Sequence, residues 1–129
     1  MVKVFILFFS LFLISCSEIN TNKSEMNITV ENNTSYNINK ILVQYGNEQF
    51  QINKLKKGDI VKNTILVGSD ISFNITIYVN KEQITIKNIG YYYYNGENNV
   101  KLIFRNKELI EKKESSIDEI KYSYNYSLE

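Results

Sequence analysis

Hydrophobic and polar residues alternate along most of the chain with a period of two. In the clearest run, residues 71–80, every odd position is Ile, Phe or Val, and the even positions are Ser, Asn, Thr, Tyr and Asn. Strict alternation of β-branched and aromatic residues is typical of a β-strand with one buried face. Asn80-Lys81 predicts a turn into a second strand through Ile84 and Ile86, and Ile89, which is out of phase, predicts a β-bulge.

Shorter runs of the same kind lie on both sides of this hairpin. They predict strands near residues 26–31, 36–45, 49–52, 60–67, 100–105 and 109–110, separated by turn residues such as Gly46-Asn47, Lys57-Gly58-Asp59 and Asn106-Lys107. A change of parity between Ile38 and Ile41 predicts a break near Asn39-Lys40.

The C-terminal residues 120–128 also alternate, with Ile120, three tyrosines and Leu128 at the even positions. We interpret this segment as a last strand. The alternative is a short helix beginning at Ser115 or Ser116, because Ser116 and Glu119 have the spacing of a capping box.

No segment shows a sustained helical period of 3.6 residues. Seven to nine short strands predict an all-β fold, namely an antiparallel β-sandwich, with a small β-barrel as the alternative. The order of strands and turns over residues 26–112 resembles small immunoglobulin-like or fibronectin-III-like modules of bacterial surface proteins. The chain lacks the Cys…Trp…Cys pattern of true immunoglobulin domains.

The N-terminal residues follow a different pattern. Lys3 precedes an apolar stretch, residues 4–14, that only Ser10 interrupts. Such a stretch is typical of the hydrophobic segment of a signal peptide and is too short to span a membrane comfortably. Leu13-Ile14-Ser15-Cys16 then resembles the lipobox of bacterial lipoproteins.

This resemblance implies cleavage before Cys16 and attachment of two or three acyl chains to that residue, enough to hold a protein stably on a membrane. It also implies an extracytoplasmic location in the cell envelope. The anchor would lie in the outer membrane of a Gram-negative cell or on the outer face of a Gram-positive plasma membrane. We therefore expect a signal peptide at 1–15, a lipidated cysteine with a flexible polar tether at 16–25, and one domain at 26–128.

Composition narrows the functional classes. The chain carries 15 Lys+Arg against 14 Asp+Glu, and cleavage removes Lys3, so the net charge gives no case for nucleic-acid binding. There is no histidine, the only cysteine is Cys16, and no Gly-rich phosphate loop or Gly-x-Ser-x-Gly motif occurs. We therefore expect no enzymatic activity, no cofactor and no metal site.

The most unusual local feature is the run Tyr91-Tyr92-Tyr93-Tyr94, followed by the turn signal Asn95-Gly96. In a strand, two of these side chains would point inward and two outward. Exposed tyrosines favour binding surfaces, whereas the alternative is that they merely pack a sheet edge. Tyr122, Tyr124 and Tyr126 could extend the same patch if they lie on the same sheet.

Two functions are consistent with these features. The first is a membrane-anchored, non-catalytic binding module that recognises a protein or a glycan. The second is an accessory, structural or inhibitor-type (immunity-like) envelope lipoprotein that docks by pairing an open sheet edge with a partner strand. The sequence assigns no oligomeric state.

Overall fold

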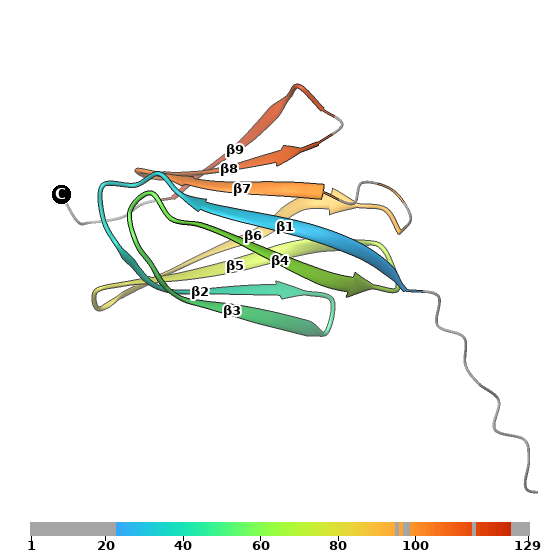
Figure 1. The fold of residues 1–129 in the computed structure, drawn as a ribbon, viewed down its shortest axis with the longest axis horizontal. Helices are drawn as coiled ribbons and strands as arrows, with labels where there is room; N and C mark the ends of the chain where they lie inside the picture. Colours follow the sequence, from blue (N-terminus) through green and yellow to red (C-terminus); the bar gives the residue numbers. More distant parts are fainter. Residues whose placement is uncertain (1–22, 95, 97–98, 115, 125–129) are drawn as a thin grey trace, which may run out of the picture.

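The computed structural model describes residues 23–94, 96, 99–114 and 116–124 of the chain. These residues form two stacked sheets (Figure 1). The strands are β1 (Ser24–Asn32), β2 (Ile38–Tyr45), β3 (Glu48–Leu55), β4 (Ile60–Val67), β5 (Ile71–Val79), β6 (Glu82–Tyr92), β7 (Asn99–Arg105), β8 (Glu108–Lys113) and β9 (Glu119–Ser123).

The five-stranded sheet has the order β4-β1-β7-β8-β9, and the four-stranded sheet has the order β3-β2-β5-β6. All neighbours are antiparallel except β1 and β7, which run parallel. The predicted antiparallel sandwich of seven to nine strands is confirmed, with this one parallel pair as an exception. The sheets do not close into one barrel, so the alternative fold is wrong.

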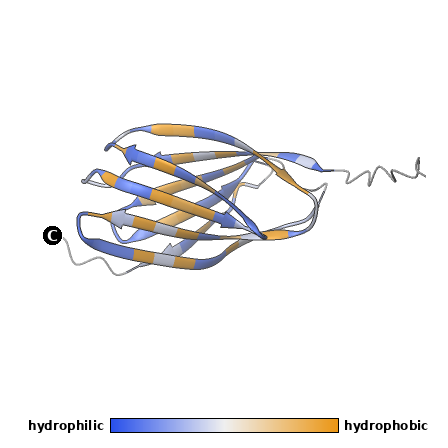
Figure 2. Ribbon diagram, turned by 90° about the horizontal axis from the view of Figure 1, so that it is seen from below, coloured by the Kyte–Doolittle hydropathy of each residue, from blue (hydrophilic) through white to orange (hydrophobic). Residues whose placement is uncertain are grey.

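Hydrophobic and polar residues alternate along the strands (Figure 2), and the buried hydrophobic residues form one core. The odd-numbered hydrophobic residues of β5 are all buried, as are Met26, Ile28 and Val30 of β1. Burying one such side chain stabilises the fold by about 1.5–3 kcal/mol. A chain without a disulfide in its described part therefore relies on this packing for its stability.

The irregular positions that the sequence predicts are confirmed. The register of β5 against β6 shifts twice, between the pairs Ile71–Tyr92 and Phe73–Ile89 and again before Ile75–Ile86. The second of these shifts places a bulge between Ile86 and Ile89, as predicted. The burial phase also changes between Ile38 and Ile41 of β2.

The C-terminal prediction is partly tested. Residues 119–123 form β9, so the strand is confirmed and a helix at Ser115 or Ser116 is wrong for the described residues. Tyr126 and Leu128 lie outside them. The expectation that Tyr122 and Tyr124 share a sheet with the tyrosine run is wrong, because β9 pairs with β8 of one sheet whereas β6 belongs to the other.

Strand directions divide the loops between two ends of the sandwich. One end holds the start of β1 at Ser24, the β2–β3 and β4–β5 connections, and the end of β6 (Figure 1). We call it the tether end, because residues 1–22 precede it in sequence. The opposite end holds the β1–β2, β3–β4, β5–β6 and β7–β8 connections, and we call it the distal end. Cys16 and the predicted signal peptide lie outside the described residues.

Candidate binding surface

The tyrosine run lies at the tether end, where β6 finishes. Tyr91 and Tyr92 are the last residues of the strand, so only they follow its inward–outward alternation. Tyr92 is 1% exposed, whereas Tyr91 is 54% and Tyr93 is 66% exposed. Tyr94 is partly exposed. Of the four tyrosines, only Tyr92 is buried, so the run does not divide into two inward and two outward side chains.

The two exposed rings form a fixed pair. The centroids of Tyr91 and Tyr93 are 5.1 Å apart in an edge-to-face arrangement. Aromatic pairs of this geometry contribute about 0.5–1.5 kcal/mol beyond the area they bury. We call this pair, together with Tyr94, the tyrosine surface.

Asp70, in the β4–β5 connection, holds the tyrosine surface in place. One of its carboxylate oxygens accepts a hydrogen bond from the Tyr94 backbone N–H at 2.6 Å, and the other accepts one from the Tyr91 hydroxyl at 3.3 Å. The negative charge of Asp70 and this hydrogen bond raise the pKa of the Tyr91 hydroxyl. The Gly96 N–H donates to the Tyr93 carbonyl at 2.9 Å and closes a turn, as Asn95-Gly96 predicts, although Asn95 itself lies outside the described residues.

Lys113 of β8 supports the same segment from the other sheet. Its ammonium donates to the Tyr91 carbonyl at 3.2 Å and lies 4.9 Å from the centroid of the Tyr92 ring. A cation at this distance from an aromatic face is attracted by it. Lys113 therefore connects β8 to the end of β6.

A buried carboxylate lies beneath the tyrosine surface. Glu111 of β8 is 1% exposed and accepts hydrogen bonds from the Tyr92 hydroxyl at 2.6 Å and from the Tyr122 hydroxyl at 3.3 Å. The Tyr122 hydroxyl in turn accepts one from the Gly90 N–H at 2.8 Å. These bonds satisfy a charge that would otherwise be costly to bury, and they join the two sheets under the exposed rings.

Burial is the main cause that raises the pKa of the Tyr122 hydroxyl. The hydrogen bond from Gly90 acts in the opposite direction, and the Glu111 carboxylate raises the pKa further. Tyr122 is therefore a neutral donor to Glu111 around neutral pH. Although it lies on the other sheet, this side chain reaches β6, so it supports the tyrosine surface from below and does not extend it.

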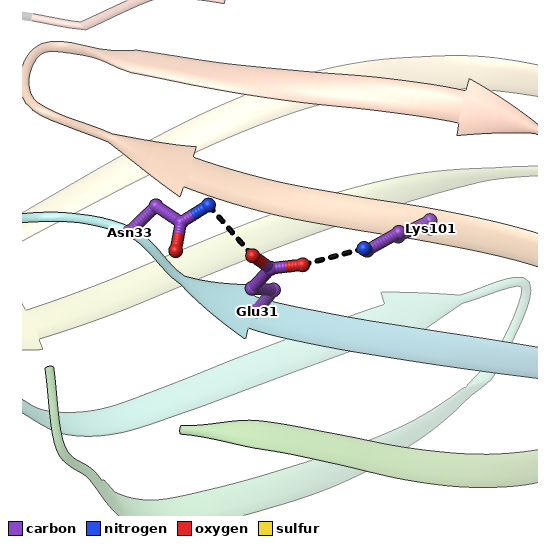
Figure 3. Close-up of polar contacts among 3 residues, drawn as sticks. All are labelled: Glu31, Asn33 and Lys101. Atoms are coloured by element: carbon purple, nitrogen blue, oxygen red, sulfur yellow. Dashed lines mark hydrogen bonds and ion pairs between the residues drawn. The ribbon is translucent and has the colours of Figure 1, made fainter. Parts of the chain in front are cut away.

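The outer face of the five-stranded sheet carries a separate charged group of residues (Figure 3). Lys101 of β7 and Glu31 of β1 form an ion pair at 2.5 Å, and the Asn33 side-chain amide donates to Glu31 at 2.6 Å. The hydrogen bond from Lys101 is the main cause that lowers the pKa of Glu31, and burial opposes it. This group ties the parallel strands together and is not part of the tyrosine surface.

The described residues offer little for metal chemistry or for membrane insertion. No three His, Cys, Asp or Glu side chains among them lie close enough to hold a metal ion. Within the same residues, no helix is long and apolar enough to cross a membrane.

Sequence reasoning identified the tyrosines but not the residues that support them. Asp70 lies between two strands, where aspartate is common for local reasons and usually needs no further explanation. Glu111 and Lys113 occupy inward positions of β8, and the Glu-x-Lys pattern there gives no sign that the carboxylate is buried. Their roles depend on pairing between sheets, which the linear sequence does not contain.

Comparison with known proteins shows the fold alone. No protein-family model matches the chain, and no curated protein matches it. A solved NMR structure of a protein from Eubacterium rectale is similar, with a TM-score of 0.52 and 16% sequence identity. The match covers 73% of this chain and 93% of that chain. The chain is therefore an all-β sandwich similar in architecture to that bacterial protein.

Proposed function

We propose that the chain is a bacterial lipoprotein anchored through Cys16, whose extracytoplasmic β-sandwich is a non-catalytic binding module for a protein or a glycan. The basic and apolar leader and the Leu13-Ile14-Ser15-Cys16 motif support the anchor. The resemblance of residues 26–112 to small immunoglobulin-like or fibronectin-III-like surface modules belongs to the same proposal, as does the cell-envelope location.

The exposed and braced pair of Tyr91 and Tyr93 carries the binding part of the proposal. Each ring is more than half exposed, yet Asp70 and Lys113 fix the backbone or hydroxyl groups beside it. Tyrosines held in this way present large contact areas and lose little conformational entropy on binding, as in known paratopes.

The position of the tyrosine surface also indicates where its partner lies. The surface and Ser24 are both at the tether end. Seven residues lie between Cys16 and Ser24, which makes eight steps along the chain, and a chain spans at most about 3.3–3.6 Å per residue. Ser24 would therefore lie within about 30 Å of the lipid anchor, and the tyrosine surface would be at the membrane-proximal end of the sandwich.

Docking by a sheet edge is the second candidate, and β4 is the edge that favours it. β4 pairs with β1 without a register shift over eight residues, and Ile60 and Leu66 are about half exposed on it. The edge strand β6, in contrast, is interrupted by two register shifts, a feature that discourages pairing between sheets.

Metabolic labelling with a palmitate analogue tests the anchor. We expect the full chain to be labelled and the Cys16→Ala variant to be unlabelled and retained as an uncleaved precursor. Equal labelling of both chains would contradict the lipoprotein assignment.

A second experiment tests the tyrosine surface and β4 in parallel. Full-length lipidated protein is cosedimented with purified peptidoglycan and crosslinked to envelope proteins in membranes, for the variants Tyr91→Ser/Tyr93→Ser and Ile60→Lys/Leu66→Lys. We expect the tyrosine variant to weaken binding at least about tenfold, because central tyrosines often contribute 2 kcal/mol or more to an interface. We expect the β4 variant to bind like the unaltered chain.

Circular dichroism of both variants controls for the fold. Loss of binding in the β4 variant alone would favour edge docking, and unchanged binding in the folded tyrosine variant would contradict the proposed surface.

A further inference from the structure

A cleft of about 530 Å³ opens at the distal end of the sandwich, the end opposite to the tyrosine surface. This volume is within the range of about 300–1,000 Å³ that is typical of small-ligand sites. The cleft is lined by Tyr36, Asn37, Ile38, Asn39, Lys54, Lys56, Val79 and Asn80. These residues come from the β1–β2 connection, the end of β3 and the β5–β6 turn.

A fully buried amide fixes one wall of the cleft. The Asn32 side chain donates to the carbonyls of Tyr36 and Leu55, both at 3.0 Å. Its oxygen accepts from the Thr34 N–H at 3.0 Å and from the Thr34 hydroxyl at 2.6 Å. Asn32 thereby joins the β1–β2 connection to the end of β3, so both sides of the cleft have a common support.

The remaining loops are also held by hydrogen bonds. The Asn37 side-chain oxygen accepts from the Lys57 N–H at 3.0 Å, and Asp59 accepts from the Lys56 N–H at 2.9 Å. The Asn39 side-chain oxygen accepts from the Asn80 N–H at 3.3 Å. The cleft is thus formed before any ligand arrives, which lowers the entropic cost of binding.

Two lining residues have a left-handed backbone conformation although neither is glycine. The φ angle is 57° at Lys54 and 54° at Asn80. Asparagine tolerates this conformation in turns, but a lysine within a strand does so only at a cost of about 1–2 kcal/mol. The bend at Lys54 brings this lysine to the cleft together with Lys56.

The chemistry of the cleft is cationic and rich in amides. Lys54 and Lys56 contribute two ammonium groups, and neither forms an ion pair with a described residue. None of the lining residues carries a carboxylate. Asp59, which lies in the β3–β4 connection, accepts a hydrogen bond from the backbone N–H of Lys56. Ammonium groups attract carboxylates and phosphates, and asparagine side chains donate to and accept from hydroxyl groups.

We propose that this cleft is a binding site for an anionic saccharide, a chain of hydroxyl-bearing units with carboxylate or phosphate groups. Lys54 and Lys56 bind the anionic group, and the Asn37, Asn39 and Asn80 side chains bind the hydroxyls. The site lies at the end of the sandwich opposite to the tyrosine surface and is independent of it.

Titration of the full-length protein in detergent tests the site by isothermal calorimetry. The probes are trigalacturonate, a glycerol-phosphate oligomer, neutral maltotriose and inorganic phosphate. We expect saturable binding of at least one of the two anionic oligomers, with maltotriose binding at least about tenfold more weakly. Whichever anionic oligomer binds better identifies the carboxylate or the phosphate as the preferred group.

Two double variants locate the binding. Lys54→Gln/Lys56→Gln should weaken binding of the preferred oligomer at least about tenfold. Lys62→Gln/Lys112→Gln, which removes the same charge from the outer face of the five-stranded sheet, should leave it within about twofold. Tyr91→Ser/Tyr93→Ser should also leave it unchanged, which separates this site from the tyrosine surface.

Several outcomes would overturn the proposal. They are the absence of saturable binding to both anionic oligomers, equal binding of maltotriose, inorganic phosphate binding as tightly as the oligomers, or equal weakening by the two lysine variants. Thermal unfolding of each variant confirms that the fold is retained, and the exposed lysines make a folding defect unexpected.

Discussion

Glu31 illustrates how single side chains join the two parallel strands. Its carboxylate accepts from Lys101 and from Asn33, and its side chain is only 15% exposed. The Lys101 side chain is 41% exposed, so the ion pair belongs with surface pairs, which contribute about 0–1 kcal/mol, and the second hydrogen bond from Asn33 places it in the upper part of that range. The group therefore stabilises the β1–β7 pairing, which is the one parallel pairing among the described strands.

This arrangement predicts how stability depends on acid. The pKa of Glu31 is lowered from 4.5 in the folded state, so its contribution is present above the unfolded pKa and is lost as pH falls below about 4.5. We expect Glu31→Gln to reduce the free energy of unfolding by about 1 kcal/mol at pH 7 and by much less at pH 3. Denaturant titrations at the two pH values measure the difference.

Glu25→Gln provides the control, since Glu25 is an exposed carboxylate on the same strand. The same loss of stability at pH 3 and pH 7 for Glu31→Gln would show that the charge of this carboxylate is unimportant.

The role of a single side chain can be predicted from the sequence when its partners are close to it along the chain. The turn at Gly46-Asn47 and the exposure of some of the tyrosines follow from short sequence patterns. The buried position of Glu111 does not, because its partners Tyr92 and Tyr122 are 19 and 11 residues away. A glutamate in a strand is usually exposed, so only the packed sheets reveal the exception.

Among the strands, β6 is the one whose irregularity has the clearest structural role. Two register shifts let its 11 residues pair with the 9 residues of β5, so that Tyr92 at the end of β6 lies opposite Ile71 at the start of β5. Gly90 lies within the register shift between Ile89 and Tyr92 and has a φ angle of 66°. A Cβ atom placed there would lie 2.5 Å from a ring carbon of Tyr92, which is fully buried and has no room to move.

We therefore predict that Gly90→Ala lowers the free energy of unfolding by about 2–4 kcal/mol, from left-handed strain together with the clash against Tyr92. Gly46→Ala is the matched control. Gly46 has a similar φ angle of 56° but no atom within 4 Å of the added Cβ, so it should cost about 1 kcal/mol. Urea unfolding compares the two, and equal losses would contradict a role for the clash.

The strands themselves were largely predictable from the sequence. Alternation marks β1, β5 and β7, and the phase change from Ile86 to Ile89 marks one of the two shifts in β6. The partner of β9 was not predictable. The alternation of β9 fits either sheet. Its placement beside β8 follows from the short connection between the two strands, and the sequence of that connection is also compatible with the start of a helix.

The two ends of the sandwich differ, and the sequence alone does not reveal this difference. Ser24 and the tyrosine surface lie at one end and the amide-rich cleft at the other. Sheet order could not be derived from the residues, because any buried strand could pair with any other of the same length. The two ends therefore became distinguishable only once the strand order was known.

If Cys16 holds the lipid, this difference predicts an orientation at the membrane. A fluorophore on a cysteine introduced at Asn47, in the tether end, should be quenched by lipids with labelled headgroups several-fold more than one at Lys81, in the distal end. Insertion of twenty Gly and Ser residues before Lys23 should reduce the difference. Equal quenching at Asn47 and Lys81 in the unaltered chain would contradict the orientation.

The position of β1 within its sheet has a mechanical consequence. β1 is hydrogen-bonded on both sides, to β4 and to β7, and the N-terminal segment leaves from its first residue. A force on that segment acts along the strand, so the hydrogen bonds on both sides of β1 are loaded together in shear. An edge strand pulled perpendicular to its own direction would instead lose its inter-strand hydrogen bonds one after another. The domain is thus attached to whatever precedes it through one of its most firmly held strands.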